Sequence, residues 1–238
     1  MERRSYLGGA ACVGSLGLAG CLGSGLFDAI GSTETVLDPP EQTRGDPSHP
    51  VYGDQLPPFS LRDPLRDETV TADQFEGERA VLMTFFFTNC PDGLVRSCSD
   101  DSGHVAAAAE DGGYADEVAF IAITFDPARD TASALQEEVD AYEIDLERDS
   151  WYFLRPETNE AAYELVANDY GVPISQPGQH EHHNDSAGGN QTAGTNQITH
   201  YGIFILANKQ GIVERAYFEQ VGWAESTITS DLETIVDS

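Results

Sequence analysis

Residues 80–92 read Ala-Val-Leu-Met-Thr-Phe-Phe-Phe-Thr-Asn-Cys-Pro-Asp, and this stretch decides the fold. Its first eight residues form an almost continuous apolar run, which predicts a β-strand buried on both faces. A second run of the same kind occupies residues 118–125. Two fully buried strands with a helix-length segment between them indicate an α/β domain whose sheet is covered by helices.

The remaining secondary structure can be placed around these two strands. We expect a short N-terminal β-hairpin, then elements in the order β-α-β-α-β-α-β-β-α. This order predicts a central mixed β-sheet flanked by helices on both faces. The expected ranges are 59–61 and 68–70 for the hairpin, 98–110, 130–142, 158–168 and 224–236 for helices, and 151–154, 201–207 and 212–218 for further strands.

The chain is strongly acidic, with 41 Asp and Glu residues against 12 Lys and Arg and a net charge of −29. The acidic residues are spread along the whole chain, and Lys209 is the only lysine. In molar salt the Debye length falls to about 3 Å, which screens the resulting self-repulsion. We interpret the composition as adaptation to a very salty medium; an acidic protein of ordinary habitat is the alternative. Without a basic patch, no nucleic-acid partner is expected.

The N-terminus has the pattern of a targeting segment. Arg3 and Arg4 precede a short run rich in Gly, Ala and Leu, which ends in Leu18-Ala19-Gly20-Cys21. A twin arginine followed by such a lipobox resembles a Tat-type lipoprotein signal. We expect residues 1–20 to be removed and Cys21 to carry lipid on the outer face of the cell membrane. An uncleaved N-terminal anchor is the alternative, although the run is a poor membrane span.

Residues 21–50 are rich in Gly, Ser, Thr, Asp and Pro and show no hydrophobic period. This composition predicts a flexible acidic linker that holds the domain, residues 51–238, away from the membrane.

Two of the four cysteines remain to do chemistry in the domain. Cys12 lies within the signal and Cys21 at the lipid site, which leaves Cys90 and Cys98. Cys90 follows the strand 80–87 and precedes a helix, and a helix N-terminus lowers the pKa of a thiol. Sites in such sheets form at the carboxyl ends of strands. A structural disulfide or two inert thiols are the alternatives, since an exported protein can keep disulfides.

Three short motifs lie at the ends of predicted strands: Phe87-Thr88-Asn89-Cys90-Pro91-Asp92, then Asp126-Pro127-Ala128-Arg129-Asp130-Thr131, then Thr199-His200-Tyr201-Gly202. In this order they resemble the Sco/SenC family, the thioredoxin-fold copper proteins of cytochrome oxidase assembly. The resemblance covers about residues 55–236. It implies a thioredoxin-like fold and copper held by Cys90, Cys98 and His200.

The other roles are less specific. Asp92 or Tyr201 could orient the copper ligands. For residues 126–131 we expect a turn, with Asp130 or Thr131 capping the next helix. Alternatively, His200 is an ordinary histidine at a strand start. The resemblance also implies a copper-containing subunit of a terminal oxidase as partner. The chemistry is consistent, because thiolates select Cu(I) and imidazole suits copper in either state.

The chain departs from the family pattern at the second cysteine. The family spacing puts that cysteine at position 94, where this chain has Leu94. Residues 93–97 could form an inserted loop that returns Cys98 to the ligand position. Alternatively the helix is straight, and Cys98 lies one turn deeper on the face of Leu94. A straight helix from Cys90 would separate the two cysteines by about 12 Å, beyond the ~7 Å limit for a disulfide.

Residues 175–197 are polar and without hydrophobic period, which predicts a loop insert. Three histidines, His180, His182 and His183, lie within four residues of it. Such tracts bind metals, so the loop could be an accessory copper-gathering segment. A soluble insert without a metal role is the alternative.

The resemblance therefore favours a membrane-anchored copper metallochaperone that delivers copper to the binuclear copper site of a terminal oxidase, and it favours this non-enzymatic role over an enzyme. The alternative is a thiol-disulfide oxidoreductase acting on exported or oxidase-subunit cysteines. Two features argue against the oxidoreductase. The chain lacks a Cys-x-x-Cys motif. Thioredoxin-like reductases also resemble one another in having a cis-proline just before the late strand, where this chain has Thr199-His200. A peroxidase is disfavoured by Thr84 in place of the proline of its motif. Nucleophile-elbow and phosphate-loop motifs are also absent from the sequence.

Overall fold

The computed structural model describes residues 35–41, 45–88, 94–141, 144–146, 150–174, 202–218 and 225–238, with the side chains of these ranges except 94–102 and 225. The chain divides into two compact units, Met1–Ser32 and Thr33–Ser238. All described residues belong to the second unit.

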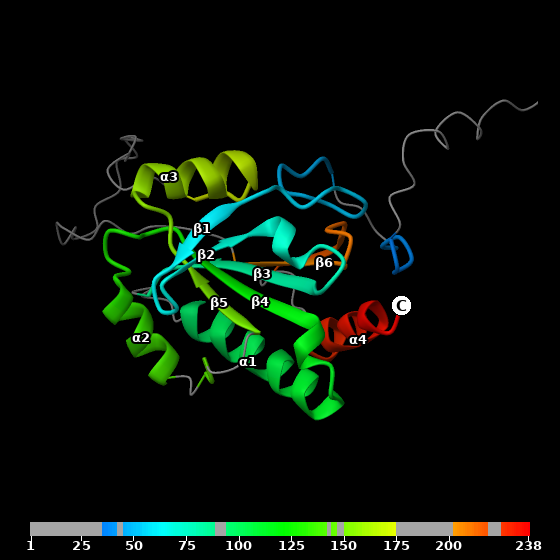
Figure 1. Cartoon of the computed structure of the whole chain (residues 1–238). Helices are drawn as coiled ribbons and strands as arrows, with labels where there is room; N and C mark the ends of the chain where they lie inside the picture. The colour runs from blue at the N-terminus through cyan, green and yellow to red at the C-terminus, as the bar shows by residue number, and fades with distance from the viewer. Residues whose placement is uncertain are drawn as a thin grey trace, which may run out of the picture. The chain divides into compact units, whose positions relative to one another are not determined.

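A five-stranded mixed sheet forms the centre of this unit (Figure 1). Three parallel strands, β3 (Ala80–Phe86), β4 (Val118–Thr124) and β5 (Trp151–Leu154), lie beside two antiparallel ones, β6 (Ile203–Ala207) and β7 (Val213–Phe218). The strand order is β5-β4-β3-β6-β7. Every residue of β3 and β4 is buried, as the apolar runs predicted. The mixed sheet is confirmed.

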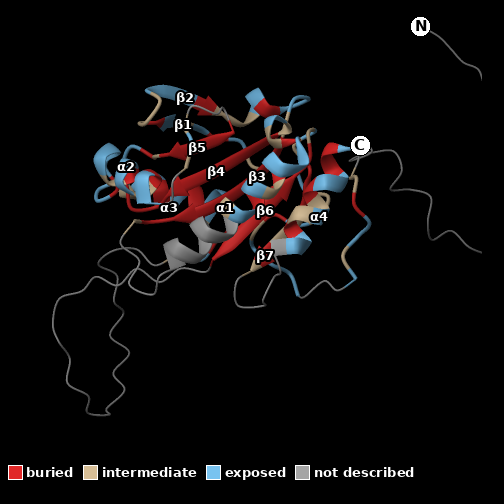
Figure 2. Cartoon of the chain, turned by 90° about the horizontal axis from the view of Figure 1, so that it is seen from below, coloured by how far each residue is buried: buried red, intermediate tan, exposed pale blue. Residues whose placement is uncertain are grey.

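Helices cover both faces of the sheet. Alternate residues of β3 therefore pack into two separate cores, one on each face. Leu82 and Phe86 pack with residues of α1 (Leu94–Gly112), α2 (Ala132–Ala141) and α4 (Glu225–Val236). Met83 and Phe85 pack on the other side with residues of α3 (Asn159–Tyr163) and its π-helical continuation η3 (Glu164–Asp169). Figure 2 shows the buried strands between these layers.

The expected N-terminal hairpin is present as β1 (Ser60–Asp63) and β2 (Glu68–Thr71), paired antiparallel. Asp63 is fully buried and joins this hairpin to the central sheet. Its carboxylate accepts the backbone N–H of Leu65 at 2.9 Å and that of Phe153 in β5 at 3.1 Å. A buried carboxylate needs such donors, and here they come from the turn of the hairpin and from the central sheet. Burial nevertheless raises the pKa of Asp63.

The C-terminal part of the expected linker lies against the domain. Glu214 in β7 is fully buried and accepts the backbone N–H groups of Val36 at 2.6 Å and Leu37 at 3.1 Å. Its carboxylate also accepts from the amide of Asn208 at 2.7 Å. The physical reason is that this buried acidic group needs donors, and the backbone of the polar segment supplies them.

The same segment runs along the outer strand of the sheet. Gly53 donates its N–H to the carbonyl of Val213, and Val213 donates to the carbonyl of Asp54. Ser48 donates its hydroxyl to the carbonyl of Gly171 at 2.6 Å. Gly171 has a φ of +60°, and a Cβ there would lie 1.9 Å from the carbonyl oxygen of Ser48. The segment therefore covers part of the edge that β7 would otherwise expose.

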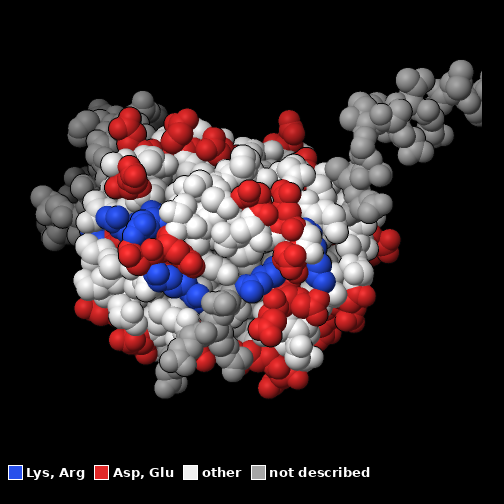
Figure 3. All heavy atoms as spheres, viewed as in Figure 1, with Lys and Arg blue, Asp and Glu red and all other residues white. Residues whose placement is uncertain are grey.

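The charged side chains on one face of the described domain are mostly acidic (Figure 3). In the face shown in Figure 3, the acidic ones are spread widely, whereas basic side chains form a few groups among them. The few basic groups on this face are interspersed with acidic ones.

Glu214→Ala should destabilise the domain, because it leaves two backbone N–H groups and the Asn208 amide without their acceptor. We expect a loss of about 2 kcal/mol or more in the free energy of unfolding. Urea unfolding in molar KCl measures it, and limited proteolysis should cut the segment near Val36 sooner. Glu41→Ala is the matched control, since it removes an exposed charge from the same segment. Equal effects of the two variants would contradict this account.

Candidate functional site

Most of the predicted ligand residues lie outside the described residues. This holds for Cys90, Asp92, His200 and Tyr201, for His180, His182 and His183 of the expected loop insert, and for Cys21 at the expected lipid site. Cys98 belongs to α1, and only its backbone is described. What the structure describes is the frame from which the first and last of the three motifs extend.

The strand pairing brings two of the motifs to one edge of the sheet. β3 and β6 are antiparallel neighbours, with Thr84 opposite Phe204, so the end of one meets the start of the other. The hydroxyl of Thr84 also donates to the carbonyl of Ile203 at 2.9 Å. In sequence, Cys90 follows Thr88 closely and His200 shortly precedes Ile203. The segments that carry them therefore leave the described domain at the same edge.

Helix α1 begins at Leu94, four residues earlier than expected. The loop alternative for residues 93–97 is therefore wrong for residues 94–97, which are helical. The physical reason is that residues 94–98 contain no proline or glycine, so helical hydrogen bonding continues through them. Cys98 lies one turn, about 6 Å along the axis, beyond Leu94 and on the same helix face.

The second motif is organised around the buried carboxylate of Asp130, which is 1% exposed. It accepts the backbone N–H of Thr88 at 3.2 Å and the hydroxyl of the same residue at 2.6 Å. The hydroxyl of Thr124, the last residue of β4, donates to its other oxygen. An ionised carboxylate only accepts hydrogen bonds, so three converging donors suit it. Asp130 thereby links the ends of β3 and β4.

Arg155, the residue that follows β5, binds the turn that carries Asp130. The guanidinium of Arg155 donates from Nη2 to the carbonyl of Pro127 at 2.6 Å and from Nε to the carbonyl of Asp130 at 3.0 Å. Five-donor guanidinium groups suit such paired acceptors. The ends of all three parallel strands are thus joined by one polar network.

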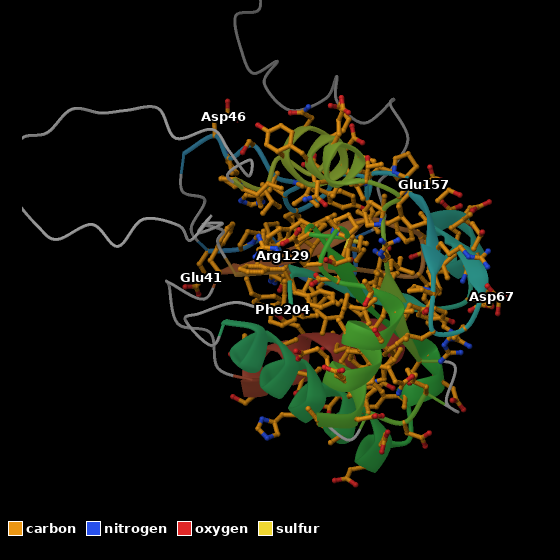
Figure 4. All side chains as sticks on the ribbon, turned by 90° about the vertical axis from the view of Figure 1, so that its left-hand side faces the viewer. Glu41, Asp46, Asp67, Arg129, Glu157 and Phe204 are labelled. Carbon is orange, nitrogen blue, oxygen red and sulfur yellow. The ribbon has the colours of Figure 1, made fainter. Side chains whose placement is uncertain are left out.

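A second contact holds the turn from the start of α3. The amide of Asn159 donates to the carboxylate of Asp126 at 3.1 Å and accepts the N–H of Ala128 at 3.0 Å. Asp126 is almost fully buried and forms an ion pair with Arg129 at 2.5 Å. Figure 4 shows Arg129 between the helix layers of the two faces.

Of the two expected caps of α2, the structure selects Thr131. Its hydroxyl accepts the N–H of Ala134 at 3.3 Å, and its carbonyl accepts that of Leu135 at 2.9 Å. The expectation for Asp130 as cap is wrong, because its carboxylate is already occupied by Thr88 and Thr124. Sequence reasoning did not identify the contributions of Thr88, Thr124, Arg155 and Asn159. One available signal was the threonine near the end of each buried strand.

Burial raises the pKa of Asp130, because loss of water disfavours the charged carboxylate. Hydrogen bonds from Thr124 and Thr88 act in the opposite direction, and the nearby charge of Asp126 raises the pKa further. The folded state therefore holds this proton more tightly than the unfolded state does.

The mixed sheet, the helix after β3 and the antiparallel β6–β7 pair define an α/β protein of the thioredoxin-like class. The sequence profile of the SCO1/SenC family matches residues 52–237. The chain therefore belongs to the SCO1/SenC family. No protein of curated function matches the sequence.

Solved structures share this fold at low sequence identity. A SCO1/SenC family lipoprotein from Bacillus anthracis matches with a TM-score of 0.59 and 16% identity, over 76% of this chain and 94% of that one. Yeast Sco1 with copper bound matches at 0.57 and 22%, over 78% and 90%. Bradyrhizobium japonicum ScoI with copper bound matches at 0.56 and 20%, over 75% and 97%. These likenesses confirm the thioredoxin-like fold.

Two searches of the described residues found nothing. None of their helices has the length and apolar character needed to span a membrane. Within the same ranges, no three His, Cys, Asp or Glu side chains are grouped so that they could hold a metal ion.

The pH dependence of stability tests the burial of Asp130. The raised pKa contributes stability that is complete below the ordinary Asp value of 3.8 and is lost as the pH rises through the raised pKa. The stability of the wild type relative to Asp130→Asn should therefore fall as the pH rises above the ordinary Asp value of 3.8. Urea unfolding at several pH values in molar KCl measures this difference. A difference that grows with pH would show that the hydrogen bonds outweigh burial.

Proposed function

We propose that this chain binds copper through Cys90, Cys98 and His200 and delivers it to the copper-containing subunit of a terminal oxidase. The observation that carries the proposal is the pairing of β3 with β6 in a SCO1/SenC fold, since the segments bearing Cys90 and His200 leave the domain at one edge. Structures of the same fold from yeast and Bradyrhizobium japonicum have copper bound.

The ligand chemistry supports copper over other metals. Two thiolates are soft ligands that favour Cu(I), and an imidazole adds a ligand suited to both oxidation states. A site with few ligands at the edge of a domain is also suited to passing its metal to a partner. Copper is therefore the cargo of this proposal, with Asp92 or Tyr201 orienting the ligands and His180, His182 and His183 as accessory ligands.

The helical start of α1 refines the role of Cys98. Position 94, which carries the second cysteine in the family pattern, is occupied by Leu94 at the beginning of the helix. Cys98 lies one turn further along the same helix. We expect Cys98 to bind copper more weakly than a cysteine at position 94 would.

Copper titration tests the ligand set. The full chain is prepared metal-free and reduced, with Cys12→Ser and Cys21→Ser so that only two thiols remain, and titrated with Cu(I) against a competing chelator in molar KCl. We expect one-to-one binding, and Cys90→Ser should weaken the Cu(I) affinity by roughly a hundredfold or more. Loss of a residue that only orients a ligand typically weakens metal affinity by about 10–100-fold, and loss of a ligand should cost more. Cys98→Ser should weaken it less, and His200→Ala should weaken it without loss of folding.

Leu94→Cys is the matched gain-of-function variant. Combined with Cys98→Ser, it restores the family spacing and should bind Cu(I) at least as tightly as the parent. Absence of competitive Cu(I) binding in the parent protein would refute the copper proposal and favour the thiol-disulfide oxidoreductase.

We also propose that the protein is exported and anchored by lipid at Cys21, in a salty medium. The twin arginine and lipobox support this, as does the description of the Bacillus anthracis structure as a lipoprotein. The segment between the lipid and the described domain would then be short, since Val36 is already held by Glu214.

Fractionation of cells tests the anchor. Cys21→Ser should move the protein from the membrane pellet to the soluble exported fraction, because a transferred lipid is its only expected hold on the membrane. Cys12→Ser is the control and should remain in the pellet. Retention of Cys21→Ser in the membrane would favour the uncleaved N-terminal anchor instead.

A further inference from the structure

The carboxylate of Asp130 determines the position of the chain just before the first cysteine. Thr88 is the last described residue after β3, and the ladder between β3 and β4 ends at Phe86 opposite Thr124. Beyond that pair, the backbone N–H of Thr88 has no strand partner and donates to Asp130 instead. Asp130 therefore replaces the sheet as the support for this part of the chain.

Thr88 donates two hydrogen bonds to one oxygen, and the pair constrains its conformation more than a single bond would. The backbone N–H and the side-chain hydroxyl both donate to Oδ1 of Asp130, at 3.2 and 2.6 Å. Together they define the position of the backbone and the side-chain rotamer of Thr88. Thr88 is the described residue nearest in sequence to Cys90 on this side.

Asp130 is itself rigidly mounted. Its backbone N–H donates to the carbonyl of Asp126 at 3.0 Å, and its carbonyl accepts from Arg155. The next residue, Thr131, caps α2. A carboxylate held on both sides in this way transmits little motion to the groups that it binds.

A polar residue at position 130 that served stability alone would not need to be charged. Burying a carboxylate costs stability, as the raised pKa of Asp130 reflects. Its advantage is that it only accepts, and all three converging groups donate. An amide would place a donor against one of them. The arrangement thus favours the order of Thr88 and Thr124 over stability.

We propose that Asp130 is a positioning residue, which acts through Thr88 to hold Cys90 in the orientation needed to bind copper. The inference rests on the proposed function for its effect on copper. The orientation of the Cys90 thiol can also be measured without metal, so that the two can fail separately.

The test compares four variants in the full chain with Cys12→Ser and Cys21→Ser. Asp130→Asn removes the acceptor-only group, Thr88→Val removes the hydroxyl, and Thr88→Ser retains it. Thr131→Ala is the matched control, because it removes the neighbouring cap of α2 without touching Thr88. Each variant is titrated with Cu(I) against a chelator. With Cys98→Ser added, each is also alkylated in metal-free form with iodoacetamide over a range of pH.

Asp130→Asn and Thr88→Val should weaken Cu(I) binding by about 10–100-fold, and the double variant should be little worse than either. The alkylation profile should also shift from that of the parent, because the support of the chain before Cys90 is lost. Thr88→Ser should match the parent. Thr131→Ala should lower the unfolding midpoint and leave both other measurements unchanged.

The inference is wrong if Asp130→Asn leaves both affinity and alkylation profile unchanged. It is also wrong if Thr131→Ala shifts them as much, since the effect would then be a general loss of stability. If the parent protein does not bind Cu(I) but Asp130→Asn still shifts the alkylation profile, the copper proposal fails and the positioning of Cys90 stands.

Discussion

Burial of β3 on both faces is the constraint on which the rest of the domain depends. Because Leu82 and Met83 point into opposite cores, each face of the sheet must be covered by other elements. One face receives α1, α2 and α4, and the other receives α3, η3 and the β1–β2 hairpin. The chain can leave such a strand only at its ends, so the residues free to do chemistry gather at the carboxyl edge.

Three buried carboxylates hold together parts of this chain that are far apart in sequence. Asp63 joins the hairpin to β5, Asp130 joins the turn after β4 to the end of β3, and Glu214 joins β7 to the segment at Val36. Each accepts at least one backbone N–H, which offsets part of the cost of burying its charge. Among the described residues, these three and Asp126 are the buried carboxylates, in a chain of net charge −29.

One of these carboxylates, Asp130, belongs to a polar network beside the candidate site. Thr88, Asp130 and Arg155 connect the ends of three parallel strands on the side from which the Cys90 segment extends. Helix α1, starting at Leu94, then fixes the face on which Cys98 lies. In a copper site at this edge, the ligands would lie on chain segments that extend from the sheet. The polar network at the strand ends would support those segments. Such an arrangement separates the groups that bind the metal from those that position them.

The sequence by itself determined the order of the elements, the mixed sheet and the position of the motifs at strand ends. Apolar runs such as 80–87 report burial locally, and Thr131 capped its helix as its residue type suggested. Only the tertiary structure decided which carboxylates are buried and what they bind. Glu214 looks like any other acidic residue in the sequence, and Asp130 suggested only a helix cap. Their partners Val36 and Thr88 lie distant along the chain. Burial and hydrogen bonding between remote segments exist only once the sheet has brought those segments together.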